Sequence, residues 1–246
     1  MHSAGNLAAV AMFVAATLAS GAASANSGCP VSYSQLKTAV AQAASQDGTG
    51  LNNNFWAVVV NRQGVVCAVA FSGAAVDSQW LLSRQIAAAK AFTANGLSLD
   101  GAPVSTAALY SWVLPIVPQG NPGSQTGPSV NPLYGLNGGN VLDSNAAFAG
   151  NYANFGGPQD PMIGKRVGGT ITFGGGLGLY AGAKAVGGLG LSGDTACADH
   201  STAWRTRNKL GLVPNPEGSL DYITLGTTAH PNCPNDGGTQ GQTPPA

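Results

Sequence analysis

The residues best suited to chemistry lie close together in the stretch SGDTACADHSTAWRTRNKLGL, residues 192–212. Asp199 directly precedes His200, and Asp194 lies in the turn before them. A histidine can ligate a haem iron, and a neighbouring carboxylate can take part in acid–base chemistry. Trp204 follows His200 by one helical turn, so both rings share a face and the indole could stack on a flat ligand. The alternative is structural: His200 pairs with Asp194 or Asp199 and fixes the turn.

Two cations on an alanine-rich stretch, Arg84 and Lys90, are candidates for binding ligand carboxylates through charge-assisted pairs. Ordinary solvated charge is the alternative for both. Arg205 and Arg207 are separated by one residue and point to different faces of a helix, so at most one of them can reach a shared pocket. Either could instead favour the negative end of the helix dipole.

Two further side chains could supply an iron ligand: His230 and the thioether of Met162. A surface position in the tail is the expected place for His230, and packing is the expected role of Met162. The sequence holds no C-x-x-C-H, which excludes c-type covalent haem attachment. It also holds no G-x-S-x-G, and no catalytic residue is assigned.

The glycines Gly188, Gly190 and Gly193 have the spacing G-x-G-x-x-G. A dinucleotide site needs a βαβ unit after this motif and an acid about 20 residues on. Only one helix and a tail follow here, so we interpret the glycines as permitting close packing and positive φ at a strand-to-helix turn. Backbone N–H groups at that turn could still favour a carboxylate.

Composition and the N-terminus point to an exported protein. Residues 7–18 are continuously apolar and Ala23-Ser24-Ala25 is an A-x-A site, so residues 1–25 are expected to be a signal peptide cleaved after Ala25. A membrane anchor is the alternative, but the run is shorter than the ~20 residues needed to span a bilayer. Ten basic and ten acidic residues give no net charge, which argues against a nucleic-acid partner. Periplasmic and extracellular locations remain open.

The four cysteines are expected to form two disulfides in an oxidising compartment. Cys29 and Cys233 lie near the two ends of the mature chain, and Cys67 and Cys197 lie inside regular segments. We therefore expect Cys29 to pair with Cys233 and Cys67 with Cys197. No C-x-x-C is present, so nothing supports a zinc or dithiol redox site.

The first half of the chain predicts a helix, a hairpin and a second helix. Ser32 and Gln35 form a capping box before a helix over 33–45. Residues 55–71 predict a hairpin that turns at 61–64. The second helix is expected within 77–96, capped by Asp77 or Ser78 and closed by Gly96. Residues 111–160 then predict an ordered loop that covers one face, with an unstructured insertion as the alternative.

The second half predicts regular structure at 167–173, strands at 174–180 and 185–191, and a helix from 195 to 210 that ends at Gly211. Because hairpins join the strands, we expect an α+β fold with a mainly antiparallel sheet and helices on its faces. Residues 26–212 would form a single domain. Residues 213–246 would form a Pro- and Gly-rich tail anchored by Cys233.

Four stretches of the chain resemble the GlcG/HbpS family of haem-binding proteins, and the exported members in particular. Residues 190–207, GLSGDTACADHSTAWRTR, are similar to the family pattern G-V-S-G-D-T-S-C-A-D-H-x-x-A-W-R-x-R. WAVVVNRQGVVCAVAF is similar to its first hairpin, and SRQIAAAKAFTAN to its R-x-I-A-x-x-K-A-x-T-A helix. GGGLGLY, within residues 160–180, is similar to its G-G-G-x-x-L-Y segment.

This resemblance implies a profilin-like domain that binds haem or another tetrapyrrole without a covalent bond, often as a homo-oligomer. The binding residues to test are then His200 as the metal ligand with Arg84, Lys90, Trp204, Asp194 and Asp199 around it. Two other hypotheses remain. One is an enzyme that acts on haem or a small organic acid through Asp199 and His200. The other is an oligomeric sensor or accessory module.

Overall fold

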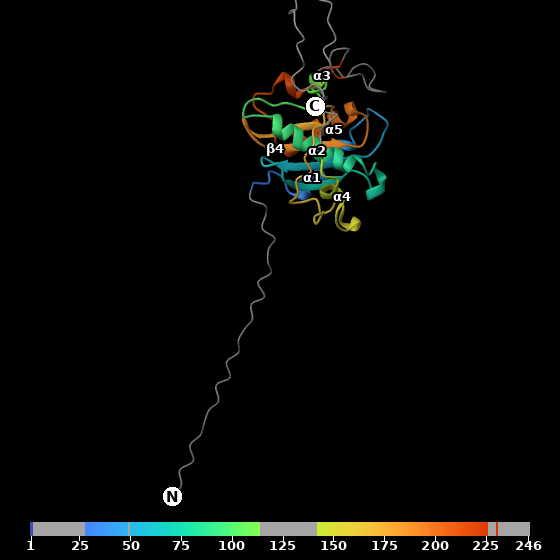
Figure 1. Cartoon of the computed structure of the whole chain (residues 1–246), viewed down its shortest axis with the longest axis vertical. Coiled ribbons are helices and arrows are strands. Elements are labelled where there is room, and N and C mark those ends of the chain that lie inside the picture. Colours follow the sequence, from blue (N-terminus) through green and yellow to red (C-terminus); the bar gives the residue numbers. More distant parts are fainter. Residues whose placement is uncertain (2–27, 49, 114–141, 226–229, 231–246) are drawn as a thin grey trace, which may run out of the picture.

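The computed structural model describes residues 1, 28–48, 50–113, 142–225 and 230. One sheet lies between helices (Figure 1). The main helices are α1 (Tyr33–Ala44), α2 (Ser83–Leu97) and α5 (Ala196–Leu210). The strands are β1 (Trp56–Asn61), β2 (Val66–Phe71), β3 (Gly176–Ala181) and β4 (Lys184–Ser192). Short helices are η1 (Val76–Ser78), α3 (Tyr110–Val113), α4 (Ser144–Phe148), η3 (Tyr152–Asn154) and η4 (Ser219–Asp221).

The sheet has the strand order β2-β1-β4-β3, and every neighbouring pair is antiparallel. The hairpins β1–β2 and β3–β4 therefore lie side by side, with β1 and β4 in the centre. Helix α2 packs on one face, and α1 and α5 pack on the other. The expected α+β class and antiparallel sheet are confirmed.

Alternation along β1 separates two hydrophobic cores, because successive strand residues point to opposite faces. Trp56, Val58 and Val60 lie in the core beneath α2. Ala57 and Val59 lie in the core shared with α1 and α5. Every residue of β1 is buried, as expected for a central strand covered on both faces.

Glycines on β4 allow α2 to lie close to the sheet. A Cβ added at Gly190 would collide with the backbone oxygen of Ala87, and one at Gly188 with that of Ala91. The intervening leucines of β4 face α1 and α5 instead. Gly193 likewise lies against the backbone of Asn54. The geometry confirms close packing as the role of these glycines. The expected positive φ is wrong, because none of the three has it, and Gly188 and Gly190 lie within β4 rather than at the turn.

The predicted helix ends are right for two helices and wrong for one. Ser32 and Gln35 form the expected capping box of α1. Helix α5 begins after Thr195 and ends at Gly211, as predicted. Helix α2, however, is capped by neither Asp77 nor Ser78, because both lie in the separate turn η1. Gln79 is extended there, and its amide donates to two carbonyl oxygens of that turn, which ends it before α2 begins. Helix α2 also continues past Gly96, which was expected to close it, and ends at Leu97.

Residues 167–173 do not form the expected regular structure. Their pairing is an isolated bridge between Leu142 and Gly168. Gly168 and Gly169 both have positive φ, which a β-strand does not accommodate. Of the long loop, residues 142–160 pack beneath α2 through α4 and the aromatic ring of Phe155. Residues 114–141 lie outside the described part of the chain.

The expected disulfide pairing is wrong, because Cys29 bonds to Cys67. The two Cα atoms lie 5.6 Å apart, because the chain before α1 runs beside the start of β2. Cys197 is also disulfide-bonded. Cys233 is the remaining cysteine of the sequence and lies outside the described residues.

Within the described residues, no helix is both long enough and apolar enough to cross a membrane. The expected signal peptide falls almost wholly in residues 2–27, which the structure does not describe. Its cleavage therefore remains a prediction.

Replacing Gly190 with alanine should destabilise the protein by about 1–3 kcal/mol, because the new methyl group overpacks the contact with α2. Gly96→Ala is the matched control, since a Cβ there meets nothing within 4 Å. That change should be neutral or should stabilise by up to about 1 kcal/mol. Urea unfolding of both variants measures the difference, and equal stabilities would contradict the close-packing role.

The Cys29–Cys67 disulfide closes a loop with a sequence separation of 38 residues. A Cys29→Ser/Cys67→Ser variant should therefore lose about 3–4 kcal/mol of unfolding free energy, by loop-closure entropy. Thermal unfolding with Cys197 left intact measures this loss. An unchanged midpoint would show that the bond contributes no stability.

Candidate functional site

Helix α5 carries the central residues of the candidate site on one face. The Thr195 hydroxyl accepts a hydrogen bond from the Ala198 N–H at 3.2 Å and begins the helix. Gly211 ends it with a φ of 68°, a left-handed conformation that suits glycine. His200, Trp204 and Arg207 then recur at the i, i+4 and i+7 spacing of one helix face.

His200 is completely buried, with an exposed fraction of 0%. Neither of its ring nitrogens has a partner within hydrogen-bond geometry among the residues that the structure describes, although the Asp221 backbone lies close enough to oppose the fall of the His200 pKa slightly. Burial, reinforced by nearby positive charges that include Arg207 and Lys90, lowers the pKa of His200 to about 3. Its imidazole is therefore neutral at physiological pH. A buried polar group without a partner is unusual, because leaving it unpaired costs free energy.

His230 lies near His200 rather than on the surface where it was expected. It is 3% exposed, and its Nε2 accepts a hydrogen bond from the Gly174 N–H at 3.3 Å. Gly174 also lies directly against His200, since a Cβ added there would come within 3.0 Å of the His200 Cβ. The centre of the Tyr110 ring lies 5.1 Å from that of the His230 ring, and the two planes are tilted by 48°. Chain segments far apart in sequence thus enclose His200.

Asp199 and Lys90 form a buried ion pair that joins α5 to α2. The Lys90 Nζ lies 2.6 Å from Asp199 Oδ2 and also donates to the Leu191 carbonyl at 3.0 Å. Burial outweighs the attraction between the two groups. It lowers the pKa of Lys90 and raises that of Asp199 to about 6. One oxygen of Asp199 thus binds Lys90, and the other accepts a hydrogen bond from the Asp194 N–H at 3.0 Å.

Glycines at the end of β3 make this ion pair possible. A Cβ at Gly175 would lie 2.8 Å from Lys90 Nζ and 3.0 Å from the Asp199 Cβ. Gly176 lies against the Lys90 backbone in the same way. The lysine side chain can therefore pass the end of the sheet to reach α5.

Asp194 shapes the loop beside α5 rather than facing a ligand. Its carboxylate accepts hydrogen bonds from the backbone N–H groups of Leu51 and Asn53, both at 2.8 Å. It also accepts one from Thr195 at 2.5 Å. The expected pairing of His200 with either aspartate is absent, since His200 has no partner among the described residues.

Arg84 lies apart from the other predicted residues. It forms a two-point contact with Asp160, 2.6 Å at each nitrogen, and donates to the Ala147 carbonyl at 2.8 Å. Its guanidinium also lies 3.9 Å from the Phe155 ring centre. Arg84 thus links α2 to residues 142–163 through Asp160 and the Ala147 carbonyl. Met162 packs in the same core, on the opposite side of the sheet from α5.

Arg205 and Arg207 point to different faces of α5, as predicted. Arg205 contacts Asp47 at 3.4 Å on the side of α1. Arg207 lies on the His200 side, where its two terminal nitrogens contact the Asp221 carboxylate at 3.0 and 2.5 Å. Its guanidinium lies 4.6 Å from the Trp204 ring centre. The Trp204 ring lies 6.4 Å from the His200 ring.

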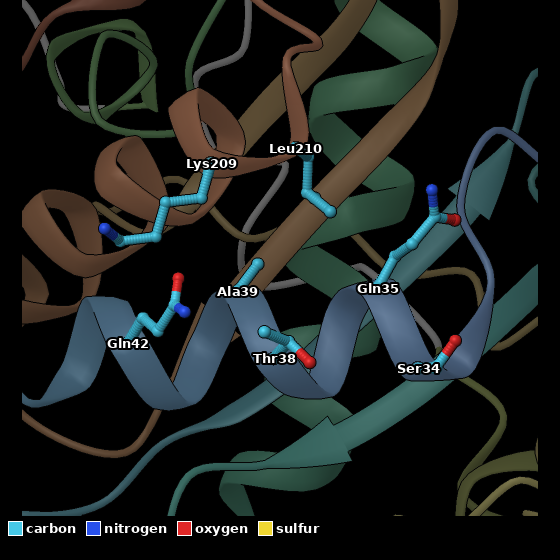
Figure 2. Close-up of a pocket in the computed structure, with 7 residues that line it drawn as sticks. All are labelled: Ser34, Gln35, Thr38, Ala39, Gln42, Lys209 and Leu210. Atoms are coloured by element: carbon cyan, nitrogen blue, oxygen red, sulfur yellow. The ribbon is translucent and has the colours of Figure 1, made fainter.

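A surface cavity of about 380 Å³ lies elsewhere, between α1 and the end of α5 (Figure 2). Its walls carry the amides of Gln35 and Gln42, the hydroxyl of Thr38 and the amine of Lys209. None of the predicted site residues lines it. In the part of the chain that the structure describes, no three His, Cys, Asp or Glu side chains are grouped as a metal site requires.

No protein-family model and no curated protein matches the chain. Among solved structures, the chain is similar to Klebsiella pneumoniae protein ORFY of family DUF336, with 20% identity and a TM-score of 0.45 over 74% of this chain and 92% of ORFY. It is also similar to PduOC, crystallised as a haem complex, with 22% identity and a TM-score of 0.43 over 72% of this chain and 89% of PduOC. Similarities this distant carry no argument about function, so the proposals below depend on the chain's own residues.

The structure brings His200, Trp204, Asp199 and Lys90 together, with Asp194 beside them, and leaves Arg84 apart. Sequence reasoning missed Asp221, which follows a Pro- and Gly-rich stretch with no periodic pattern. It also gave no preference to Arg207 over Arg205, although seven-residue spacing from His200 places Arg207 on the same helix face.

Acid should destabilise the ligand-free protein through His200. An unfolded histidine has a pKa of about 6.5, so below that pH the unfolded chain gains a proton that folded His200 does not accept. Stability from the neutral imidazole is thus present above that pH and lost as pH falls toward 3. At about pH 5 the loss is about 2 kcal/mol.

Urea unfolding at several pH values tests this on the parent and a His200→Leu variant. The variant's unfolding free energy should fall less between neutral pH and about pH 5. Parallel pH profiles would show that His200 titrates normally in the folded state.

Proposed function

We propose that the mature chain is an exported protein that binds haem non-covalently, with His200 as the iron ligand. The observation that carries this proposal is a fully buried imidazole whose two ring nitrogens have no partner among the described residues. Residue resemblance to the GlcG/HbpS family, which includes His200 itself, is the second support.

The donor chemistry of the site fits haem. A depressed pKa leaves the His200 lone pair available at neutral pH, and imidazole is a common axial ligand of haem iron. Trp204 offers an aromatic surface on the same helix face. When bound, haem would supply an iron centre able to exchange an electron or to bind a small ligand.

His200 is covered, so a ligand can reach it only after the covering segments shift. Those segments include the Asp221 backbone, which lies close to the His200 ring, together with His230 and Gly174. Tyr110 packs on His230 and would move with it. Ligand entry is therefore coupled to a local opening of this region.

The other predicted residues would act mainly through the fold. Lys90 and Asp199 hold the first turn of α5, which carries His200. Asp194 orders the adjoining loop. Arg84 is engaged by Asp160 on the other side of the sheet, so in this proposal it stabilises the domain rather than binding a propionate.

Disulfide chemistry supports the exported location. Cys29 bonds to Cys67, and Cys197 is bonded as well, as is typical of an oxidising compartment. A signal peptide over residues 1–25 and assembly into a homo-oligomer complete the proposal. Light scattering on the purified mature chain measures whether it forms a homo-oligomer.

A visible-absorption titration with hemin tests the function. The parent should give a saturable Soret shift, and His200→Leu should bind roughly tenfold more weakly or worse, with an altered spectrum, because one iron ligand is lost. Thr202→Val is the matched control. Thr202 is equally buried on the same helix, and its hydroxyl also has no partner among the described residues. Unchanged affinity and spectrum in His200→Leu would remove His200 as the ligand.

The same sample separates binding from haem degradation. Adding a reductant to the hemin complex should give a stable reduced spectrum if the protein only binds haem. Loss of the Soret band with a biliverdin-like product would favour the enzyme hypothesis that involves Asp199 and His200.

A further inference from the structure

One face of α5 is covered by three consecutive residues of the C-terminal segment. Asp221 lies on Arg207, and the Tyr222 ring lies 5.5 Å from the Trp204 ring. Ile223 packs in a small apolar cluster that includes Cys197. From Cys197 to Arg207 this face is about 15 Å long, and His200 lies within it.

The contact at Arg207 has the geometry of carboxylate recognition. Both terminal nitrogens meet the Asp221 carboxylate, and both side chains are fully buried. A planar guanidinium binds a carboxylate in this two-point manner. One nitrogen also donates to the Gly178 carbonyl at 3.2 Å, whereas the buried Nε has no partner among the described residues. Arg207 therefore keeps a spare donor on the same face as His200.

Asp221 differs from the other two buried carboxylates in how it is held. Asp160 also accepts hydrogen bonds from the backbone of Gly156 and Met162. Asp199 also accepts one from the backbone of Asp194. Within the described residues, Arg207 is the only donor to the Asp221 carboxylate. A second carboxylate could thus replace Asp221 without breaking other bonds to that group.

Within the described residues, few hydrogen bonds join the backbone of the segment that carries Asp221 to the rest of the domain. Ser105 makes two hydrogen bonds to its backbone, to Leu220 O at 2.8 Å and to Tyr222 O at 3.2 Å. Its regular structure is the single turn η4. Burial also raises the pKa of the Asp221 carboxyl, against the opposing effect of Arg207. Segments of this kind open locally more easily than core helices or strands.

We propose that Arg207 is the carboxylate-binding residue of the His200 site, and that Asp221 occupies it until a ligand carboxylate takes its place. This inference rests on the proposed function and names the ligand class: a flat aromatic macrocycle that bears a free carboxylate, as a haem propionate does. The exchange replaces one buried ion pair by another of the same kind. The free-energy cost of removing water from the Arg207 guanidinium is therefore already part of the ligand-free fold.

Metal-free protoporphyrin IX and its dimethyl ester test the inference without an iron–histidine bond. The parent should bind the free acid more tightly than the ester, because the ester cannot form the ion pair. In Asp221→Asn the ratio of acid to ester affinity should rise by roughly tenfold, since Arg207 loses its internal partner. Asp160→Asn is the matched control, because it breaks a buried Arg–Asp pair of the same type elsewhere and should leave the ratio unchanged.

A second variant keeps the test informative if Asp221→Asn folds poorly. Arg207→Met/Asp221→Leu replaces the pair by apolar side chains, a change that buried ion pairs often tolerate. This variant should bind the acid and the ester equally. Hydrogen exchange gives an independent readout: the free acid should speed exchange in residues 219–225 of the parent, as Asp221 leaves Arg207.

The outcomes separate the two proposals. If the parent binds hemin but shows equal affinity for acid and ester in every variant, the role of Arg207 is overturned and haem binding stands. Unchanged exchange in residues 219–225 with the acid bound would also overturn it. If neither the parent nor Asp221→Asn binds any porphyrin, with or without iron, both proposals fail.

Discussion

The close approach of α2 to the glycines of β3 and β4 is the constraint on which the rest of the structure depends. Side chains at Gly188 or Gly190 would collide with the α2 backbone, so the helix can lie this close to the sheet only where the strand residues beneath it are glycines. At this depth Lys90 reaches past Gly175 to Asp199 on α5. The orientation of His200 therefore follows from residues that carry no functional group.

Three buried ion pairs hold neighbouring segments of the chain against this frame. Arg84 and Asp160 hold the 142–163 segment beneath α2, and Lys90 and Asp199 hold the start of α5. Arg207 and Asp221 hold the chain after α5. Pairs of this kind contribute less stability than their attraction suggests, because both charges lose water. Their value lies in fixing which segment lies where, since an unpaired partner would be left buried and charged.

Local patterns predicted much of the frame. The capping box at Ser32, the hairpin turn at 61–64 and the limits of α5 at Thr195 and Gly211 all depend on residues within a few positions of each other. Such signals are legible in one sequence because the interactions that cause them are local. The start of α2 was missed because Gln79 satisfies the preceding turn with its own amide.

Longer-range choices could not be predicted in the same way. Pairing of Cys29 with Cys67 depends on where the chain before α1 meets β2, which no spacing reveals. The partners of Arg84 and Arg207 come from segments without periodicity. His200 could be named as a ligand from its residue type and motif. Its lack of a partner is a property of the packed structure and appears in no local pattern.

The ion pairs also reduce the number of charged side chains available at the protein surface. The four pairs among the described residues take up four of the ten basic and four of the ten acidic side chains, and three of these pairs are fully or almost fully enclosed. The other six basic and six acidic side chains are a small number for 246 residues, and the two signs balance. The protein thus projects only a weak field beyond about 10 Å at ordinary ionic strength. Its encounters with other molecules are governed by diffusion and contact rather than steering, and its adhesion to charged matter should change little with added salt.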